Sequence, residues 1–335
     1  MLKEKKISII GTGAYGTALA LFLSKNGYEV ILWSKNAKYL RELKKERKNK
    51  FFFPNIRFPK NLKIGISLAM VASFSKNILI VVPSQKFKRI LQEIKPFLKK
   101  NSRIVWATKG LEKNTGRLLQ EVAEEILGKN IPLAFISGPT FAHEVAVGLP
   151  TSIVVSSKNK KFREDLKEIL CSEKYFLVYK TSDFIGVQIC GVVKNIIAIG
   201  SGISDGIGLG SNAKAFLITQ GFSEMVALGT AMGAIKKTFF GVAGIGDLVL
   251  TCTTDHSRNR SFGILIGKGN SIKKSKRILG KTVEGYNNIK EVLILSKRYN
   301  INMPIVKQIY KILYRKKNAK NSLLSLMYNL KIRNN

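Results

Sequence analysis

The first 180 residues alternate short β-branched, apolar runs with amphipathic segments, and this alternation constrains the fold more than any other feature. Helical patterns separate most of the runs, at 14–26, 85–99 and 117–127. Continuous apolar strands that alternate with helices indicate a mostly parallel sheet covered on both faces. The predicted strands are ISIIG at 7–11, EVILW at 29–33, NILIVVPS at 77–84, RIVWATKG at 103–110, LAFISGP at 133–139 and TSIVVSS at 151–157.

The pattern changes near residue 184, where long helical periodicity replaces the strands. Residues 183–203 and 212–234 each have helical length, and the Gly-rich stretch SDGIGLGS between them predicts a turn. The remaining segments, including 286–300 and 303–315, also favour helices. The sequence therefore predicts an α/β N-terminal domain over 1–183 and an all-α domain over 184–335.

A glycine motif follows the first predicted strand. Gly11, Gly13 and Gly16 have the G-x-G-x-x-G spacing and open a helix. Gly11 permits the tight turn, Gly13 lets a pyrophosphate approach the backbone, and Gly16 lets helix and strand pack closely. The motif predicts a Rossmann-like, doubly wound sheet that binds a dinucleotide, and the alternative is a Gly-rich turn without a ligand.

The end of the second predicted strand bears on coenzyme choice. Sites that prefer NAD usually place an acidic residue there for the ribose hydroxyls. This chain has Ser34, Lys35 and Asn36 instead, so hydroxyl and ammonium groups are available for a 2′-phosphate. NADP(H) is therefore favoured and NAD(H) stays open, unless Lys35 is merely one more surface lysine.

A solitary lysine lies inside the apolar stretch at 184–203. On a helix, Lys194 shares a stripe of small and polar residues with Gln188, Gly191 and Asn195, opposite a broad isoleucine and valine face. Residues 181–235 contain only two basic residues, Lys194 and Lys214, so the region looks sheltered from solvent. A sheltered lysine has a lowered pKa and can act as a proton donor, although it could also simply pair with a carboxylate.

Further candidate groups lie at strand ends and in a second segment poor in basic residues. Lys109 follows the predicted strand at 103–110, where ligands of open α/β sheets bind. Asp247 is an isolated acid in GIGDLVLT and could orient a lysine. Ser257, Arg258 and Asn259 supply hydroxyl, guanidinium and amide donors suited to an anionic group such as a phosphate.

Composition excludes some classes of site and leaves others open. The formal net charge of +36 would attract polyanions, yet the lysines are scattered along the chain, which favours a solvated basic surface. Three widely spaced cysteines and two histidines predict no metal site and suit a reducing cytoplasm. We expect no signal segment and no membrane span, because polar residues interrupt the most hydrophobic stretch.

Eight segments, taken together and in order from Ile7 to about Ala319, resemble bacterial NAD(P)-dependent glycerol-3-phosphate dehydrogenase. The matching segments are GTGAYGTALA, NILIVVPS, VWATKGLE, ISGPTFAHE, the stretch at 183–215, GVAGIGDLVLTCT, SRNRSFG and VEGYNN. The resemblance implies reversible reduction of dihydroxyacetone phosphate to sn-glycerol 3-phosphate, which feeds phospholipid synthesis. A cytoplasmic enzyme, and a homodimer, are compatible with it.

The resemblance also implies roles for individual residues. Lys194 would protonate the alkoxide as hydride reaches the substrate, Lys109 would contact substrate and coenzyme, and Asp247 would line the site. The other implied substrate contacts are Gly138, Thr140, Ser257, Arg258 and Asn259. Beside the motif glycines, the implied coenzyme contacts are Ala14, Tyr15, Lys35, Lys109, Ala142, Arg258, Thr282 and Glu284.

Two alternatives remain open at this level. One is a related two-domain, NADP-dependent hydroxy-acid dehydrogenase, which the trio at 257–259 beside an intact GIGDLVLTCT disfavours. The other is a redox-inactive protein that binds nucleotides or polyanions through its charge. A degenerate enzyme should have lost its isolated reactive groups, yet Lys109, Lys194 and Asp247 are all present.

Overall fold

The computed structural model describes residues 5–171, 176–280 and 282–333 and contains two compact units. The first unit runs to Thr108, resumes at Leu119 and ends at Phe184. The second unit takes Lys109–Leu118 and continues from Ile185. The sequence analysis placed the short segment Lys109–Leu118 in the N-terminal domain over 1–183, but it packs with the helical unit, although it lies between a strand and a helix of the first unit.

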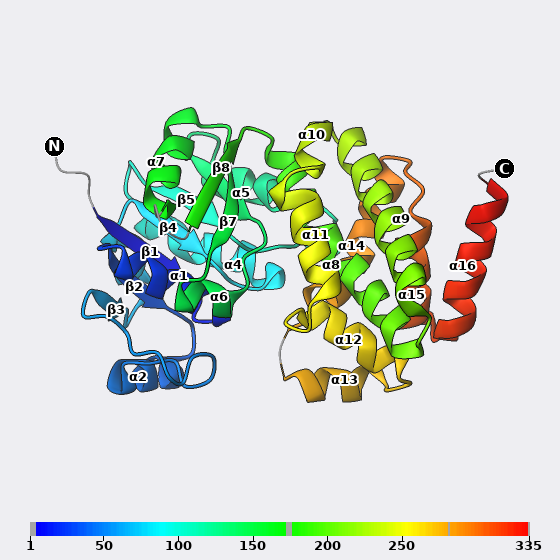
Figure 1. The fold of residues 1–335 in the computed structure, drawn as a ribbon. Helices are drawn as coiled ribbons and strands as arrows, with labels where there is room; N and C mark the ends of the chain where they lie inside the picture. The colour runs from blue at the N-terminus through cyan, green and yellow to red at the C-terminus, as the bar shows by residue number, and fades with distance from the viewer. Residues whose placement is uncertain (1–4, 172–175, 281, 334–335) are drawn as a thin grey trace. The chain divides into compact units, whose positions relative to one another are not determined.

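The first unit is built on one eight-stranded sheet, in the order β3-β2-β1-β4-β5-β6-β7-β8 (Figure 1). All neighbouring strands are parallel except β6 and β7, which are antiparallel. The sequence predicted six of these strands and missed β3 and β8 at the two edges. The strands are β1 (Lys6–Ile10), β2 (Glu29–Trp33), β3 (Leu62–Ile64), β4 (Asn77–Ile80), β5 (Arg103–Trp106), β6 (Leu133–Ser137), β7 (Thr151–Ser156) and β8 (Phe176–Thr181).

The parallel register of β2, β1 and β4 brings their carboxyl ends to the same end of the sheet. Backbone hydrogen bonds join Gly11 to Trp33 and Val81 to Ile10, just where β1, β2 and β4 end. The glycine motif, the residues after β2 and the residues after β4 therefore share this end of the sheet, as a doubly wound sheet requires. The helices of this unit are α1 (Ala14–Lys25), α2 (Ala37–Glu46), α3 (Leu68–Phe74), α4 (Ser84–Ile94) with the 3₁₀ turn Lys95–Phe97, α5 (Leu119–Leu127), α6 (Ala142–Val147) and α7 (Lys160–Leu170).

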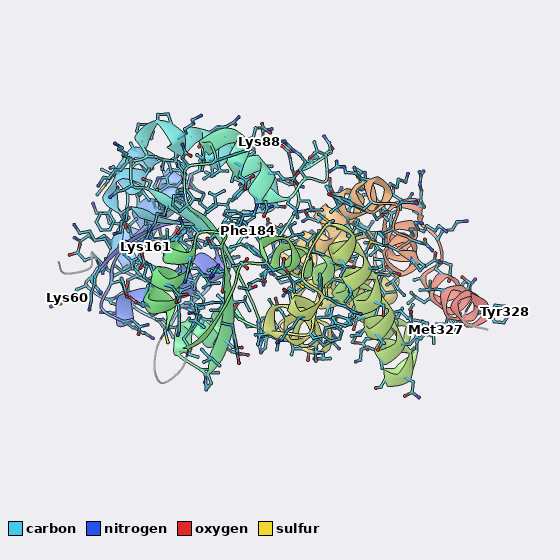
Figure 2. All side chains as sticks on the ribbon, turned by 90° about the horizontal axis from the view of Figure 1, so that it is seen from above. Lys60, Lys88, Lys161, Phe184, Met327 and Tyr328 are labelled. Atoms are coloured by element: carbon cyan, nitrogen blue, oxygen red, sulfur yellow. The ribbon has the colours of Figure 1, made fainter. Side chains whose placement is uncertain are left out.

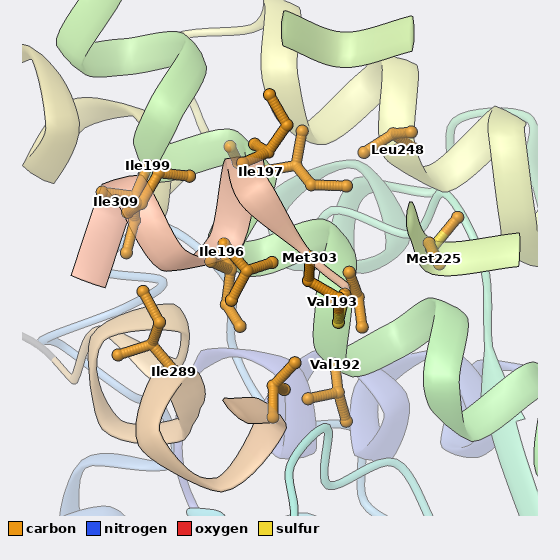
Figure 3. Close-up of a cluster of buried hydrophobic side chains, with 14 of the residues drawn as sticks. Val192, Val193, Ile196, Ile197, Ile199, Met225, Leu248, Ile289, Met303 and Ile309 are labelled. Carbon is orange, nitrogen blue, oxygen red and sulfur yellow. The ribbon is translucent and has the colours of Figure 1, made fainter. Parts of the chain in front are cut away.

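The second unit is helical and surrounds one long buried helix, α8 (Phe184–Ile207). Its isoleucines and valines pack with Met225, Leu248, Ile289 and Met303 in the core of this unit (Figure 3). α8 extends four residues further than expected, because Ser204–Ile207 continue the helix and the turn begins at Gly208. The other helices are α9 (Gly210–Ala231), α10 (Lys236–Phe239), a π-helical turn (Val242–Gly246), α11 (Asp247–Thr253), α12 (Arg258–Gly267), α13 (Ile272–Leu279), α14 (Glu284–Arg298), α15 (Pro304–Arg315) and α16 (Ala319–Arg333).

Glycines let α8 and α12 cross in direct backbone contact. A Cβ atom on Gly202 would lie 2.0 Å from the carbonyl oxygen of Arg260, and one on Gly263 would lie 2.1 Å from that of Ile199. Gly206 and Gly267 repeat this arrangement one turn later. The close crossing brings the stripe of α8 that carries Lys194 near the first turn of α12.

α8 is also long and apolar enough to cross a membrane by length and composition alone, and 94% of its most apolar window is buried within the protein. Such burial is typical of the core helix of a soluble protein.

Candidate active site

The glycine motif has the geometry that a phosphate-binding turn needs. Gly11 has φ +127°, and a Cβ there would lie 2.1 Å from the carbonyl oxygen of Val81. A Cβ on Gly16 would lie 2.0 Å from the carbonyl oxygen of Gly11, so any side chain would separate α1 from the turn. Gly13, in contrast, faces open space, and this leaves room for a ligand against the backbone.

The N-terminus of α1 can receive an anion. Gly13 is its N-cap and provides no side-chain hydrogen bond to the free N–H groups of the first turn. The buried Asn49 supports this turn, since its amide donates to the carbonyl oxygen of Thr12 and to Thr17 Oγ1. An adjoining pocket of about 600 Å³ is lined by Thr12, Gly13, Tyr39, Glu42, Lys50, Phe51 and Phe52. These features fit a dinucleotide phosphate.

The end of β2 carries one buried hydroxyl and one exposed ammonium. Ser34 Oγ is buried and has no hydrogen-bond partner among the described residues. Lys35 is 61% exposed, and its Nζ lies 3.4 Å from Glu93 Oε1 of α4, which Arg89 also contacts at 2.6 Å. These two cations hold the pKa of Glu93 below its usual range, chiefly through the Arg89 hydrogen bond. A buried hydroxyl without a partner in the described part of the chain and an exposed basic side chain therefore follow β2.

The α1 and β6 ends meet through side chains that the sequence singled out. Thr140 Oγ1 donates to the hydroxyl of Tyr15 at 2.9 Å, and Gly138 precedes it with φ +155°. A Cβ on Gly138 would approach the carbonyl oxygen of Ser152 to 2.8 Å. Ala142 begins α6 directly after this turn. The first unit thus brings Tyr15, Gly138 and Thr140 together beside the glycine motif.

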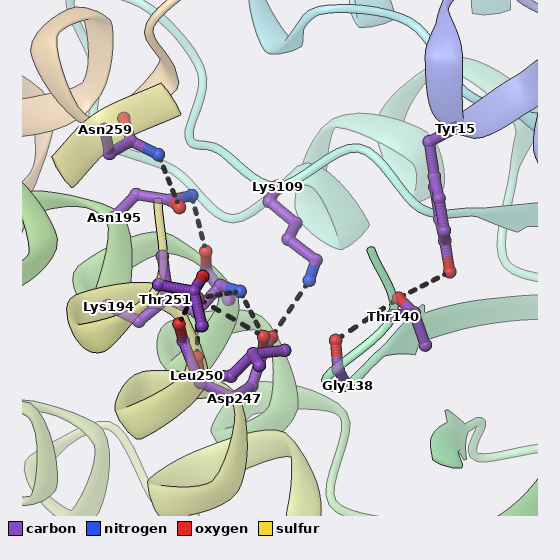
Figure 4. A network of polar contacts seen from close by, with 12 residues as sticks. Tyr15, Lys109, Gly138, Thr140, Lys194, Asn195, Asp247, Leu250, Thr251 and Asn259 are labelled. Atoms are coloured by element: carbon purple, nitrogen blue, oxygen red, sulfur yellow. Dashed lines mark hydrogen bonds and ion pairs between the residues drawn. The ribbon is translucent and has the colours of Figure 1, made fainter. Parts of the chain in front are cut away.

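Two lysines converge on one carboxylate in the second unit (Figure 4). Lys194 Nζ donates to Asp247 Oδ1, and Lys109 Nζ lies 3.0 Å from Asp247 Oδ2. Lys194 also donates to Thr251 Oγ1 at 3.0 Å, and Thr251 donates in turn to the backbone carbonyl of Asp247. The π-helical turn Val242–Gly246 ends at Asp247, and such turns are frequent at functional sites.

The surroundings of Lys194 change its acidity. Its side chain is only 5% exposed, and burial lowers the pKa to about 7. The carboxylate of Asp247 acts in the opposite direction, whereas the second ammonium, on Lys109, adds to the lowering. A lysine in this state can hold or release a proton near neutral pH.

A hydrogen bond between two side-chain amides joins Asn195, the residue after Lys194, to the trio Ser257, Arg258 and Asn259. Asn259 donates from its amide nitrogen to Asn195 Oδ1 at 2.8 Å, and its oxygen accepts from the backbone N–H of Gly285 at 3.0 Å. Ser257 is the N-cap of α12, where its hydroxyl accepts from the backbone of Arg260. Arg258, at the first position of that helix, keeps its side chain exposed. The trio therefore lies at an α12 N-terminus, which favours anions.

The sequence analysis missed Thr251 and placed Asn195 on the stripe of Lys194 without assigning it to the site. Thr251 lies four residues after Asp247, which is one helical turn, and Asn195 follows Lys194 directly. Thr282, an expected coenzyme contact, is exposed, and Glu284 begins α14. Within the described part of the chain, no group of three or more His, Cys, Asp and Glu side chains could hold a metal ion.

Known proteins match this chain over nearly its whole length. The sequence models of the NAD-dependent glycerol-3-phosphate dehydrogenase N-terminus and C-terminus match residues 6–163 and 183–324. A glycerol-3-phosphate dehydrogenase [NAD(P)+] from Yersinia pestis is 53% identical over 96% of this chain and 95% of its own.

Solved structures agree with these matches. Glycerol-3-phosphate dehydrogenase from Coxiella burnetii has a TM-score of 0.93 at 43% identity and covers 96% of this chain and 98% of its own. The enzyme from Saccharomyces cerevisiae has a TM-score of 0.80 at 26% identity, with coverage of 96% and 98%. The chain therefore belongs to the NAD-dependent glycerol-3-phosphate dehydrogenase family.

Proposed function

We propose that this protein reversibly reduces dihydroxyacetone phosphate to sn-glycerol 3-phosphate with a nicotinamide coenzyme. The observation that carries the proposal is the cluster of Lys109, Asp247 and Lys194, in which a buried lysine has a pKa of about 7. Family membership indicates the reaction, and the cluster supplies the proton that the reaction needs.

Held at the glycine motif, a nicotinamide coenzyme would supply the hydride that the carbonyl carbon accepts. Lys194 donates its proton to the carbonyl oxygen as negative charge develops there, so the product is an alcohol and the lysine is left neutral. Solvent then returns the proton to Lys194. Asp247 and Thr251 hold the ammonium in place from two directions, and Lys109 places a second positive charge beside the same carboxylate.

The substrate's phosphate needs donors of its own. We assign it to Arg258 and Asn259, with Ser257 beside them at the α12 N-terminus. Gly138 and Thr140 are proposed as substrate contacts from the first unit. The coenzyme contacts are proposed to be Gly11, Gly13, Ala14, Tyr15, Gly16, Lys35, Lys109, Ala142, Arg258, Thr282 and Glu284.

We further propose that the enzyme uses both coenzymes and prefers NADP(H). The buried hydroxyl of Ser34 and the ammonium of Lys35 support this preference, and residues 34–36 contain no carboxylate that would repel a 2′-phosphate. The three cysteines remain free thiols, which suits a reducing cytoplasmic setting. A homodimer is compatible with this function.

The decisive experiment follows the absorbance of reduced nicotinamide with dihydroxyacetone phosphate and either NADPH or NADH. Lys194→Ala should lower kcat by about 10²–10⁴-fold while the protein still folds and binds coenzyme. Lys214→Ala is the matched control, because this lysine pairs with Asp205 in the same unit. A folded, unmutated protein that turns over neither coenzyme would refute the proposed activity.

A further inference from the structure

The segment that carries Lys109 forms a small hairpin against α14. Leu111 and Leu118 pair as an antiparallel bridge, and the N–H of Glu112 donates to the carbonyl oxygen of Arg117. Both leucines are buried in the core of the helical unit. The hairpin is therefore held by the unit that contains Lys194 and Asp247.

Three side chains of α14 bind the hairpin, two of them on adjacent turns and the third about two turns further along. Asn288 Oδ1 accepts the backbone N–H of Leu111 at 2.7 Å. Glu291 Oε1 accepts that of Asn114 at 3.4 Å, and Arg298 donates to the carbonyl oxygen of Thr115 at 2.6 Å. The Asn288 contact is the nearest of the three to Lys109, two residues away along the chain.

Asn288 has a second contact at the start of α14. Its Nδ2 donates to Glu284 at two points, to the backbone oxygen at 2.9 Å and to the carboxylate Oε2 at 3.0 Å. The side chain is 2% exposed. One buried amide thus joins the Lys109 hairpin to Glu284, two places where the proposed function expects contact with the ligands.

We infer that Asn288 is a positioning residue of this active site, whose amide sets the places of Lys109 and Glu284 together. The inference rests on the proposed function, which gives those two residues their roles. Among the side chains of this size, an amide alone offers an acceptor to the N–H of Leu111 and a donor to the carboxylate of Glu284. Aspartate would keep the acceptor and put a second carboxylate oxygen against Glu284, and alanine would provide neither group.

This difference defines a pair of variants with different expected results. Asn288→Asp should raise KM for NADPH about tenfold and leave KM for dihydroxyacetone phosphate within about twofold, because the hairpin stays bound while Glu284 is repelled. Asn288→Ala should raise both KM values. The KM for dihydroxyacetone phosphate should rise in this variant as it does in Lys109→Ala. A KM for dihydroxyacetone phosphate that is raised in Asn288→Ala but close to the unmutated value in Asn288→Asp would show that Asn288 positions Lys109.

Two variants on the same helix control for stability. Asn287→Ala changes the neighbouring asparagine, which is only partly buried, whereas Asn288 is buried. Ile289→Val trims a fully buried core contact of α14. Both should leave KM for each ligand unchanged, whatever they do to the Tm. If the alanine variant does not fold, the aspartate variant alone carries the test through its two KM values.

The outcomes separate the inference from the function beneath it. The inference alone is overturned if Lys109→Ala lowers activity while a folded Asn288 variant, either Asn288→Ala or Asn288→Asp, keeps the KM values of the unmutated protein. Ile289→Val with the same KM changes as Asn288→Ala also overturns it, because the effect is then one of stability. If Lys109→Ala has the same kcat and KM values as the unmutated protein, the proposed role of Lys109 is refuted, and the inference is refuted with it.

Discussion

Lys194 shows how a single side chain takes its chemistry from its surroundings. Burial favours the neutral amine, while Asp247 and the hydroxyl of Thr251 favour the charged form. The balance leaves a pKa of about 7, well below the usual value for lysine. The residue is therefore able both to give a proton to a developing alkoxide and to take one from an alcohol.

The two directions of the reaction should respond oppositely to pH. Reduction needs protonated Lys194, so kcat for dihydroxyacetone phosphate should fall as pH rises through about 7. Oxidation of glycerol 3-phosphate needs the neutral amine, so its kcat should rise over the same range. Initial rates from pH 5.5 to 9 in both directions would show this, and parallel profiles would contradict it.

Thr251 should set the position of that inflection. Its hydroxyl donates a hydrogen bond to the backbone carbonyl oxygen of Asp247, so the hydroxyl oxygen is able to accept a hydrogen bond from the ammonium of Lys194. Thr251→Val removes an acceptor worth about 1.5–3 kcal/mol to a charged donor, so the inflection should move down by roughly one to two pH units. Thr251→Ser should stay at the unmutated position. An unmoved inflection in the valine variant would mean that the hydroxyl does not stabilise the charged lysine.

At the scale of elements, helix ends and helix crossings carry the arrangement of the second unit. α15 begins at Pro304 without a side-chain cap from its own N-terminal residues. Glu224 of α9 provides the missing acceptor, since its carboxylate receives the N–H groups of Ile305 and Val306 at 2.5 and 3.2 Å. Buried glycines, in turn, let α8 and α12 touch.

The buried cap should make stability depend on pH. Burial raises the pKa of Glu224 to about 8, although the two N–H groups act against this. The folded state therefore binds a proton that the unfolded state releases, and this contribution to stability is present below pH 4.5 and is lost as pH rises to about 8. Thermal unfolding should show a Tm that falls with pH across this window, and Glu224→Gln should flatten that fall. An equal slope in both proteins would contradict the assignment.

The glycine crossing should tolerate no methyl group. Gly202→Ala would place a Cβ 2.0 Å from the carbonyl oxygen of Arg260, and rigid backbone cannot yield cheaply there. The loss of unfolding free energy should be about 1–3 kcal/mol, beyond any gain in helix propensity. Gly246→Ala, whose Cβ would have its nearest neighbour at 3.9 Å, is the control in the same urea titration. Equal midpoints for the two variants would refute the packing argument.

At the scale of the whole molecule, the basic charge of +36 belongs mainly to the surface. Side chains such as Lys60, Lys88 and Lys161 extend away from the ribbon (Figure 2). Such charges attract any polyanion through counterion release, without a specific site. Lys194 and Lys109 pair with the buried Asp247 instead, so the surface charge and the reaction are separate properties.

Binding to nucleic acid should therefore be weak and sensitive to salt. Affinity for a DNA duplex, measured by fluorescence anisotropy, should fall steeply between about 50 and 200 mM salt and show no sequence preference. Reduction of dihydroxyacetone phosphate at the higher salt should be unaffected by added DNA. Sequence-dependent binding that persists there would favour the nucleic-acid reading.

Local patterns were sufficient to predict the elements and the type of fold. Continuous apolar runs identify six strands, the 3.6-residue period identifies the longer helices, and the glycine motif identifies the phosphate turn, because neighbours along the chain determine each of these. The edge strands β3 and β8 were not predicted. β3 has only three residues, and in β8 the apolar side chains of Leu177 and Tyr179 are exposed, so neither strand gives a clear pattern of buried residues.

The sequence by itself also singled out Lys194, Lys109 and Asp247, since isolated charges in apolar or glycine-rich surroundings stand out in a lysine-rich chain. Only the tertiary structure joined them, because Asp247 is 53 residues from Lys194 and 138 from Lys109. It alone placed the Lys109 hairpin on α14 and completed the cluster with Thr251 and Asn195. Contacts between distant residues depend on how helices pack, and no local period encodes that packing.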